Sequence, residues 1–430
     1  MGSIGGWVNV LLWNQDWFAA ELRALGHTAV TMGYTRHLDV NFPTPLVHIS
    51  EALAHFPGGA RPDVLIIHDN SAPVGLIGLE TLNIPIIFYS VDAHHHCELH
   101  RSLARVFDLT FVAQKDYIPQ FEAERLPVAW LPLWASEVVE PLAEKTRGAV
   151  FVGTLNPKLN PDRVTFFDQL RATVDMLCVT GKWQEIFPQS EIVINQTVKG
   201  DLNFRVFEAM GAGALLLTER TPNGLFELFR ENEHLVTYTK GDVAEAAYRI
   251  RALLADKALT RAIAARGRAA ILAYHRARNR LDTVLQAAHA LRPKSRLDAR
   301  FQLMHNFAEF GRRLLPLDSN FALAALTESL SHADAGLRHH EPLNDDLGCQ
   351  VAVAAALYDR LTNGTSGDRI LLRMLERYPN QKILTLPLIR ARLNRGEQSE
   401  ATRLAKIHFP NREGAEVFSL AESVLTQLIG

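Results

Sequence analysis

Cysteine is scarce in this sequence, which contains only Cys97, Cys178 and Cys349 among 430 residues. Three cysteines far apart cannot build a disulfide framework, so a reducing, cytoplasmic setting is expected. No uninterrupted apolar run reaches the ~20 residues that span a bilayer, so no transmembrane segment is expected. A basic leader is missing, Asp16 interrupts the first apolar run, and Gly6 replaces the Ser or Thr of a myristoylation signal. We therefore expect neither a signal peptide nor a lipid anchor.

An excess of charge is also missing. The formal net charge is −2, which predicts no general attraction to nucleic acid or to anionic membranes. The sequence has no GxGxxG, Walker lysine loop or GxSxG in a suitable context, which argues against dehydrogenases, P-loop enzymes and serine hydrolases. With 47% hydrophobic and 21% charged residues, the composition is that of a globular protein of two or three domains.

Short apolar runs alternate with helical patterns over the first 134 residues. The predicted strands are 7–13, 29–33, 63–68, 85–91, 109–113 and 128–133, with helices such as 17–25 and 99–107 between them. This alternation predicts a parallel sheet with helices on both faces. Ligands gather at the carboxyl ends of such strands, so we single out the loops 14–16, 69–71 and 92–98.

A second series of the same kind follows a polar linker over 135–148. Its predicted strands are 149–153, 174–180, 191–195, 214–218 and 235–239, and the domain extends to residue 292. Arginine-rich helices over 242–255 and 260–290 complete it, and we interpret them as a solvated amphipathic pair. The predicted fold class is therefore α/β, with two facing Rossmann-like domains.

No strand signal remains after residue 296. Helical patterns occupy 300–315, 321–335, 345–361, 368–378, 382–395, 399–408 and 414–428. Such helix pairs with short breaks predict an all-α domain over 296–430 that resembles a tetratricopeptide solenoid, without a fixed period. Its role is either to bind a protein partner, such as the acceptor, or to stabilise the enzyme as a cap.

The most specific stretch is Asn195–Glu219, which reads as a polar loop, a short helix and a buried strand. Arg205 and Glu208 lie three residues apart on one face of that helix. A cation and a carboxylate near a helix N-terminus suit a ligand with a phosphate and a diol, because the helix attracts the phosphate and the carboxylate accepts ribose hydroxyls. The alternative is an ordinary surface ion pair.

The run KGDLNFRVFEAMGAGALLLTE resembles the donor site of GT-B glycosyltransferases, in particular the CgeB/YkvP-type relatives of glycosyltransferase families 1 and 4. The resemblance implies that Glu208 binds the nucleotide ribose and that Arg205 or Lys199 neutralises the diphosphate. It also implies that the last helix of the second domain crosses back over the first. Gly200 departs from the E-x7-E spacing of many retaining members, which leaves the stereochemical course open.

Further donor-side candidates stand at strand ends in the same region. Gly153 and Thr154 follow one strand, where a glycine lets backbone approach a phosphate. The others are Lys182, Asn195, Asn203 and, across the gap, Asn14. For several of them a plain turn or a solvated side chain is an equal alternative.

Acceptor-side candidates cluster in the sequence Asp92–His100. We expect Asp92 or His94 to accept the proton of the acceptor hydroxyl, and His96, His68 and Asp69 to contact the acceptor. A polar loop, or a turn capped by Asp69, would serve a purely structural purpose. The HExxH spacing is absent, and the resemblance implies catalysis without a bound metal or other cofactor.

The sequence therefore predicts a glycosyltransferase, of class EC 2.4, that moves a sugar from a nucleotide-diphosphate sugar to an acceptor hydroxyl on a protein or a surface glycan. Two alternatives stay open. One is a GT-B-fold epimerase or hydrolase of the nucleotide sugar itself. The other is a non-catalytic adaptor in which the helical repeats bind the partner.

Overall fold

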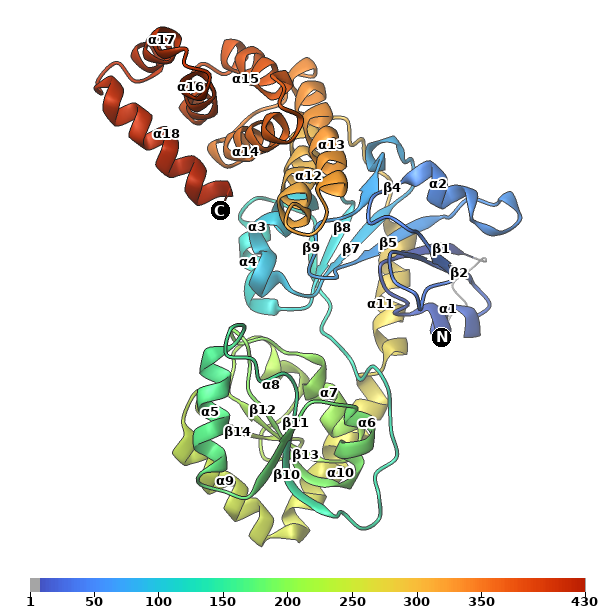
Figure 1. The fold of residues 1–430 in the computed structure, drawn as a ribbon. Helices are drawn as coiled ribbons and strands as arrows, with labels where there is room; N and C mark the ends of the chain where they lie inside the picture. The colour runs from blue at the N-terminus through green and yellow to red at the C-terminus, as the bar shows by residue number, and fades with distance from the viewer. Residues whose placement is uncertain (1–7, 430) are drawn as a thin grey trace.

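The computed structural model describes residues 8–429 and contains two large parallel sheets followed by a helical domain (Figure 1). A small parallel sheet of two strands, β4(Val47–His48) and β6(Leu76–Ile77), accompanies the first large one. The first sheet has seven strands in the order β3(Val40–Asn41), β2(Thr28–Gly33), β1(Asn9–Trp13), β5(Val64–His68), β7(Ile86–Ser90), β8(Leu109–Val112) and β9(Val128–Trp130). Every neighbouring pair is parallel. The central strands are buried throughout because both faces of this sheet are covered.

The second sheet has five parallel strands in the order β11(Met176–Val179), β10(Arg147–Val152), β12(Ser190–Asn195), β13(Leu215–Glu219) and β14(Val236–Tyr238). Its helices include α5(Pro161–Arg171), α7(Phe204–Gly211), α9(Val243–Ala255) and α10(Lys257–Tyr274). The predicted α/β class with two Rossmann-like domains is confirmed. The predicted strands of both series are present to within two or three residues, although Trp7 lies outside the described residues.

The linker before the second sheet is irregular, and β10 begins at Arg147, two residues before the expected start of that domain. Between the domains, α11(Ala277–Ala290) runs from the second domain back to the first (yellow in Figure 1). Arg280 on this helix is buried and donates to the backbone carbonyls of Pro132 at 2.7 Å and Leu133 at 2.9 Å. The interpretation of 260–290 as one half of a solvated pair therefore holds for Arg261, Arg266, Arg276 and Arg278, which are exposed, but not for Arg280. The predicted helix is interrupted at His275, between α10 and α11, and Arg280 is buried at the junction between the domains.

The helical domain contains α12(Arg300–Leu314), α13(Ser319–Arg338), α14(Asp345–Thr362), α15(Ser366–Arg377), α16(Thr385–Asn394), α17(Gln398–His408) and α18(Gly414–Ile429). These helices agree closely with the predicted ones. Helices α12 and α13 pack against each other, as do α14 and α15, and α16 and α17. No helix within residues 8–429 combines the length and apolarity that crossing a membrane requires. The likeness to tetratricopeptide repeats stays a prediction.

Helix α12 completes the first domain. The connection from β5 to β7 contains only β6(Leu76–Ile77) and the single turn Leu79–Thr81, so it supplies no long helix to cover the sheet. Leu303, Phe307 and Phe310 of α12 join the same core as the β5 and β7 side chains. The C-terminal domain thus supplies a layer that a crossover helix provides in an ordinary parallel sheet.

A buried ion pair fixes this junction. Arg296 is 2% exposed, pairs with Asp108 at the start of β8, and donates to the carbonyls of Val106 at 3.0 Å and Leu82 at 2.9 Å. Asp108 also accepts from the backbone N–H of Ile86 at 2.7 Å. Because these groups come from two segments of the first domain, 82–86 and 106–108, the chain is anchored to both of them just before the helical domain begins.

Candidate functional site

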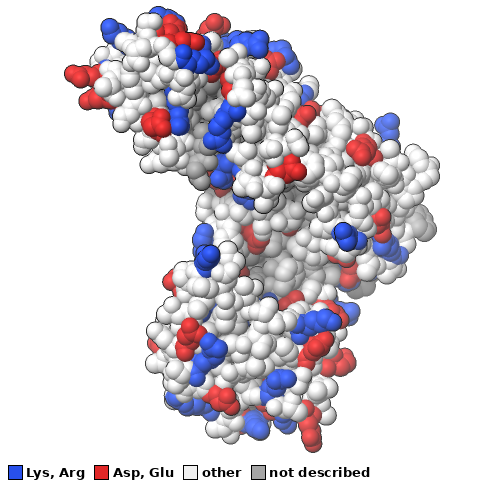
Figure 2. Space-filling view, viewed as in Figure 1, with Lys and Arg blue, Asp and Glu red and all other residues white. Residues whose placement is uncertain are grey.

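The carboxyl ends of the two sheets face one another across a cavity of about 330 Å³. The first domain supplies most of the wall: Gln15, Trp17, Asp69, Asn70, Ser71, Val91, Asp92, His94, Gln114 and Leu133. The second domain supplies Asp201, Asn203 and Phe204 at the start of α7. All three first-domain loops that the sequence singled out contribute to this wall. The molecule narrows at this level in Figure 2, between the second domain and the rest.

Arg205 lies at the carboxyl ends of β10 and β12. Its Nη1 donates to Asn195 Oδ1 at 2.7 Å and its Nε donates to the carbonyl of Val152 at 3.0 Å. Its guanidinium lies 4.7 Å from the ring centroid of Phe151. A Cβ at Gly153 would lie only 2.5 Å from Arg205 Nη2, so a side chain there would displace the Arg205 guanidinium from this position. Burial lowers the pKa of Arg205 to about 10, and the nearby Arg163 contributes in the same direction.

Arg163 is a second buried guanidinium that the sequence analysis missed. It stands in the first turn of α5 and donates to Gln196 Oε1 and to the carbonyl of Gln196, both at 3.0 Å. Burial lowers its pKa, which Asp201 and Glu219 partly offset. A cation opposes the dipole at a helix N-terminus, and that anomaly is the signal that could have identified it. Two guanidinium groups therefore lie close together at one edge of the second sheet.

Glu208 takes a separate partner. Its Oε1 accepts from the hydroxyl of Ser136 in the linker at 2.6 Å, and burial raises its pKa. No ion pair joins Arg205 and Glu208 within residues 8–429, so the surface ion pair that their spacing allows is not formed. Neither side chain lines the 330 Å³ cavity, whereas Asn203 and Phe204, immediately before them, do. Arg205 and Glu208 are both half-buried and follow directly in sequence on the residues that form the wall of the cleft.

Asn203 and Lys199 lie at the domain boundary. Asn203 is the N-cap residue of α7, and its buried Oδ1 has no hydrogen-bond partner within the described residues. A buried acceptor without a partner is costly, so this oxygen is suited to a donor group on a ligand. Lys199 has a positive φ of 54°, and its Nζ donates to the carbonyl of His94 at 3.1 Å, across the gap.

The remaining donor-side candidates are dispersed. Thr154 is exposed in the loop after β10, and the Lys182 side chain is 80% exposed with Glu185 at 3.7 Å. Asn195 is fully buried and donates to the hydroxyl of Thr218 at 3.0 Å while it accepts from Arg205. Asn14 has a φ of 78° and donates to the carbonyl of His68 at 3.0 Å. Their roles toward a ligand stay predictions.

The acceptor side is built around two aspartates. Asp69 Oδ1 accepts from the N–H of Ser71 at 2.8 Å, and Oδ2 accepts from the N–H groups of Asp92 at 2.8 Å and Val91 at 3.1 Å. The carboxylate of Asp92 accepts from the hydroxyl of Ser71. Asp69 thus caps a turn, as one alternative had it, and holds the backbone that presents Asp92 to the cavity.

The histidine cluster begins a helix. The sequence predicted a loop over 92–98, but α3(Ala93–Ala104) starts directly after Asp92, with a non-helical conformation at His96. The loop prediction is therefore wrong, because Asp92 serves as the N-cap residue that begins the helix. His94 is 8% exposed, lines the cavity, and has an Nδ1 without a partner among the described residues. Burial first, and then His95, lower the pKa of His94 to about 4.

His96 and His68 lie away from the cavity. His96 Nδ1 is 3.3 Å from Nη2 of Arg313 in α12. His68 is fully buried, with its ring centroid 5.2 Å from that of Trp17 and 5.9 Å from that of Phe18. Burial lowers the pKa of His68 to about 3, so its ring is neutral. Among residues 8–429, no three or more His, Cys, Asp or Glu side chains are grouped to hold a metal ion.

Gln114 joins the two domains, and no motif or spacing in the sequence marks it. Its Oε1 accepts from the N–H of Leu202 at 2.9 Å and from Nδ2 of Asn223 at 2.6 Å. Asn223 Oδ1 in turn accepts from the N–H of Asp116 at 3.0 Å. These bonds, with that of Lys199 to His94, hold the domains closed around the cavity.

Two facing Rossmann-like domains with a cleft between their sheets define the GT-B fold. Residues 163–286 match a family model described as glycosyl transferase-like. No curated protein matches the sequence of the chain. Anabaena Alr3699/HepE in complex with UDP and glucose is similar, with a TM-score of 0.51 and 14% identity over 66% of this chain and 100% of that one.

Two further solved structures are similar to this chain over the same share of its length. HepE in complex with UDP-glucose has a TM-score of 0.51 at 12% identity, again over 66% of this chain and 100% of that one. Sucrose-phosphate synthase from Thermosynechococcus elongatus has a TM-score of 0.50 at 10% identity, over 66% of this chain and 99% of that one. At these identities the likeness shows the fold, which is GT-B. In each case the match leaves about a third of the chain uncovered.

Proposed function

We propose that this protein is a glycosyltransferase of the CgeB/YkvP-like group that moves a sugar from a nucleotide-diphosphate sugar to an acceptor hydroxyl in the cytoplasm. The observation that carries the proposal is the cavity in which the N-terminus of α7 faces Asp92 and His94. The glycosyl transferase-like match over 163–286 supports it, because it includes α5, α7 and both buried arginines. HepE, which has the same fold, was crystallised with UDP-glucose, and we extend that donor class to this chain.

The donor diphosphate would bind between the N-terminus of α7 and the two buried guanidiniums. Arg205 and Arg163 supply positive charge in a site from which most water is excluded, where it acts strongly on a leaving diphosphate. The first N–H groups of α7 and Nδ2 of Asn203 are further donors. Glu208, held by Ser136, would accept the ribose hydroxyls. No metal is part of this proposal.

The acceptor hydroxyl would enter from the first domain and lose its proton to Asp92 or His94. Asp92 is held by the hydroxyl of Ser71 and by the backbone bonds of Asp69. His94 is neutral at pH 7 because its pKa is about 4, and its Nδ1 is free to accept a proton. Closure of the domains through Gln114 would keep water from hydrolysing the donor.

Substitution of the base tests this proposal. Asp92→Asn and His94→Ala are expected to reduce turnover about 10²–10⁴-fold where they remove the base, while nucleotide affinity is retained. His95→Ala is the matched control, because His95 stands beside His94 but does not line the cavity. Since the pKa of His94 is about 4, turnover that depends on its neutral form should persist from pH 7 to about pH 5 and fall near pH 4. Wild-type turnover in both variants would contradict the proposal.

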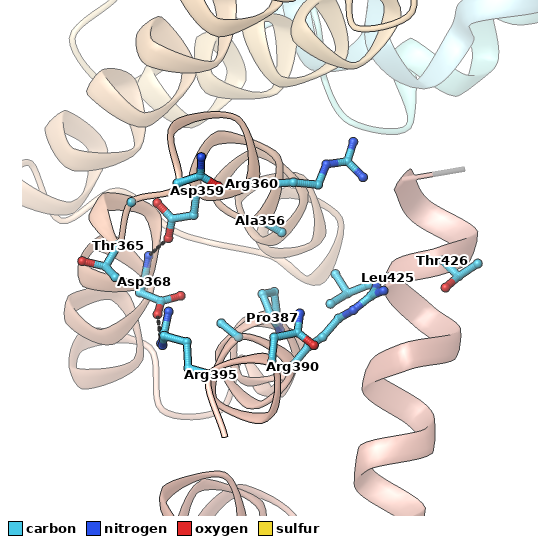
Figure 3. Close-up of a pocket in the computed structure, with 14 residues that line it drawn as sticks. Ala356, Asp359, Arg360, Thr365, Asp368, Pro387, Arg390, Arg395, Leu425 and Thr426 are labelled. Carbon is cyan, nitrogen blue, oxygen red and sulfur yellow. Dashed lines mark hydrogen bonds and ion pairs between the residues drawn. The ribbon is translucent and has the colours of Figure 1, made fainter. Parts of the chain in front are cut away.

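The acceptor would be a protein held by the helical domain. A cavity of about 620 Å³ lies between α14, α16 and α18, where Arg360 and Arg390 both extend toward α18 (Figure 3). Asp359 accepts from the N–H groups of Gly367 and Asp368, at 2.8 and 2.9 Å, so its charge is already satisfied. Arg360 has no ion pair or side-chain hydrogen bond within the described residues and is open to an acidic side chain of a partner.

The double substitution Arg360→Ala and Arg390→Ala tests this role. It is expected to lower transfer to a protein acceptor about tenfold, from the loss of a charge-assisted bond to Arg360, and to leave hydrolysis of the donor unchanged. Arg390 already pairs with Glu422 of α18 at 2.9 Å, so its replacement also removes that ion pair. Arg403→Ala is the control, because Arg403 lies on α17 outside the cavity and pairs with the neighbouring Glu400. Equal transfer by all three proteins would contradict a role of this cavity in acceptor binding.

A further inference from the structure

One face of α12 holds the loop that carries the acceptor-side wall of the cleft. This loop, residues 69–75, follows β5 and includes Asp69, Asn70 and Ser71 of the cavity. Asn306 is buried, its Oδ1 accepts from the N–H of Val74, and its Nδ2 donates to the carbonyl of Val74, both at 2.8 Å. Two bonds from one side-chain amide therefore hold both peptide groups that flank the Cα of Val74.

Two further residues of α12 contact the same loop. Arg313 Nη1 donates to the carbonyl of Ser71 at 2.7 Å, while its Nε donates to Glu309 at 2.7 Å. Phe310 lies against Gly75, where a Cβ would be only 3.1 Å from the ring. Asn306, Phe310 and Arg313 are spaced by four and three residues and so lie on one face of the helix. One face of α12 therefore contacts this loop from Ser71 to Gly75.

The contacts of α12 with this loop extend through Ser71 to the candidate base Asp92. Ser71 has a φ of 60°, in the left-handed region that a serine seldom adopts, so its conformation depends on the groups around it. Its carbonyl is held by Arg313, its N–H by Asp69, and its hydroxyl donates to Asp92. A path of direct bonds thus runs from Glu309 and Arg313 through Ser71 to the carboxylate of Asp92.

We propose that the helical domain positions Asp92 for proton transfer through the Arg313–Ser71 contact, so that α12 is part of the catalytic unit. This inference rests on the proposed function, in which Asp92 faces the acceptor. Arg313 does not line the 330 Å³ cavity and is a positioning residue. A displacement of about 1 Å at a reacting group can cost ~10²-fold in rate, so a small shift of Ser71 is sufficient for a large effect.

The test uses the full-length protein and the nucleotide sugar that raises its Tm most in a screen of UDP-, GDP-, ADP- and dTDP-sugars. Release of the nucleotide by transfer to water is measured, so no acceptor needs to be known. Arg313→Met is expected to lower kcat about tenfold or more, with KM for the donor within about twofold. Arg313→Lys should restore part of the loss, because an ammonium can still donate to the carbonyl of Ser71.

Arg312→Met is the matched control. Arg312 is adjacent in sequence and shares Glu309, at 2.8 Å, but makes no contact with Ser71. Arg312→Met should lower the stability by a similar amount as Arg313→Met, because both variants lose an ion pair with Glu309. It should nevertheless keep the wild-type kcat. Equal loss of kcat in both variants would overturn the inference, because the effect would then follow from Glu309 and general stability.

A double-mutant cycle makes the test independent of stability. If Arg313 acts through Ser71, Ser71→Ala should lower kcat by a similar factor, and the double variant should be no worse than either single one. Multiplied losses would overturn the proposed path. A failure of the proposed function is distinguishable from a failure of this inference. Wild-type turnover in both Asp92→Asn and His94→Ala would show that neither residue is the base, whatever the result for Arg313.

Discussion

Replacement of Arg205 by alanine is expected to weaken the binding of UDP, used as the test nucleotide, about ten- to a hundred-fold. A charge-assisted hydrogen bond contributes ~1.5–3 kcal/mol, and 1.4 kcal/mol corresponds to a factor of ten. Replacement of a side chain that contacted only the ligand would leave the Tm unchanged. The structure predicts that it falls, because Arg205→Ala leaves the carbonyl of Val152 and Oδ1 of Asn195 without a donor.

Calorimetric titration well below the Tm of the variant therefore has to separate affinity from stability. Inorganic pyrophosphate is the second ligand. Arg205→Ala should weaken both UDP and pyrophosphate, whereas Glu208→Gln should weaken UDP alone, since pyrophosphate has no ribose. Arg261→Ala is the control, because Arg261 forms an ion pair with Glu191 away from the cleft. Unchanged UDP affinity in Arg205→Ala would remove the donor site from this position.

Deletion of everything after Arg292 is expected to prevent the first domain from folding. The deletion removes Leu303, Phe307 and Phe310 from the core beside β5 and β7. Burial of side chains of this size contributes ~1.5–3 kcal/mol each, and a whole domain has only ~5–15 kcal/mol of net stability. The same deletion also leaves Asp108 buried without Arg296.

If the helical domain only bound a partner, this deletion would spare activity on a small acceptor. The structure favours the opposite outcome, because α12 is a layer of the first domain rather than a tethered module. The single substitution Arg296→Met isolates the ion pair and should cost ~3–5 kcal/mol, measured by urea unfolding. A soluble fragment 1–292 with a cooperative unfolding transition would show that α12 is dispensable for the core.

These two roles of the helical domain are compatible. Helices α12 and α13 belong to the junction with the first domain, whereas the cavity with Arg360 and Arg390 lies among α14, α16 and α18. Stabilisation and the proposed partner binding, which were alternatives at the level of sequence, would thus fall to different helices.

The surface charge is consistent with a specific rather than a general mode of recognition. Basic and acidic side chains are interspersed on the face shown in Figure 2, without a continuous stripe of one sign. Long-range electrostatic attraction from a nearly neutral protein is weak. A partner would therefore be recognised through complementary charges at individual sites, such as the cavity near Arg360.

The sequence by itself determined the elements and their order. Buried parallel strands are continuous apolar runs and amphipathic helices repeat every 3.6 residues, so both are local properties that can be read directly. The same rule put the loops after β1, β5 and β7 at the carboxyl edge of the sheet, and these loops line the cavity. The run around Arg205 and Glu208 identified the second domain for the same local reason.

Only the tertiary structure decided which distant groups meet. Arg163 stands beside Arg205, Gln114 bonds the loop before α7, and Arg313 holds Ser71 across 242 positions of sequence. No periodicity records such pairs, because each depends on how the chain packs rather than on its neighbours. The covering of the first sheet by α12 was decided in the same way. The apolar face of a helix indicates that the helix is buried, but it does not indicate which surface covers that face. Here α12 covers the part of the first sheet that no crossover helix between β5 and β7 covers.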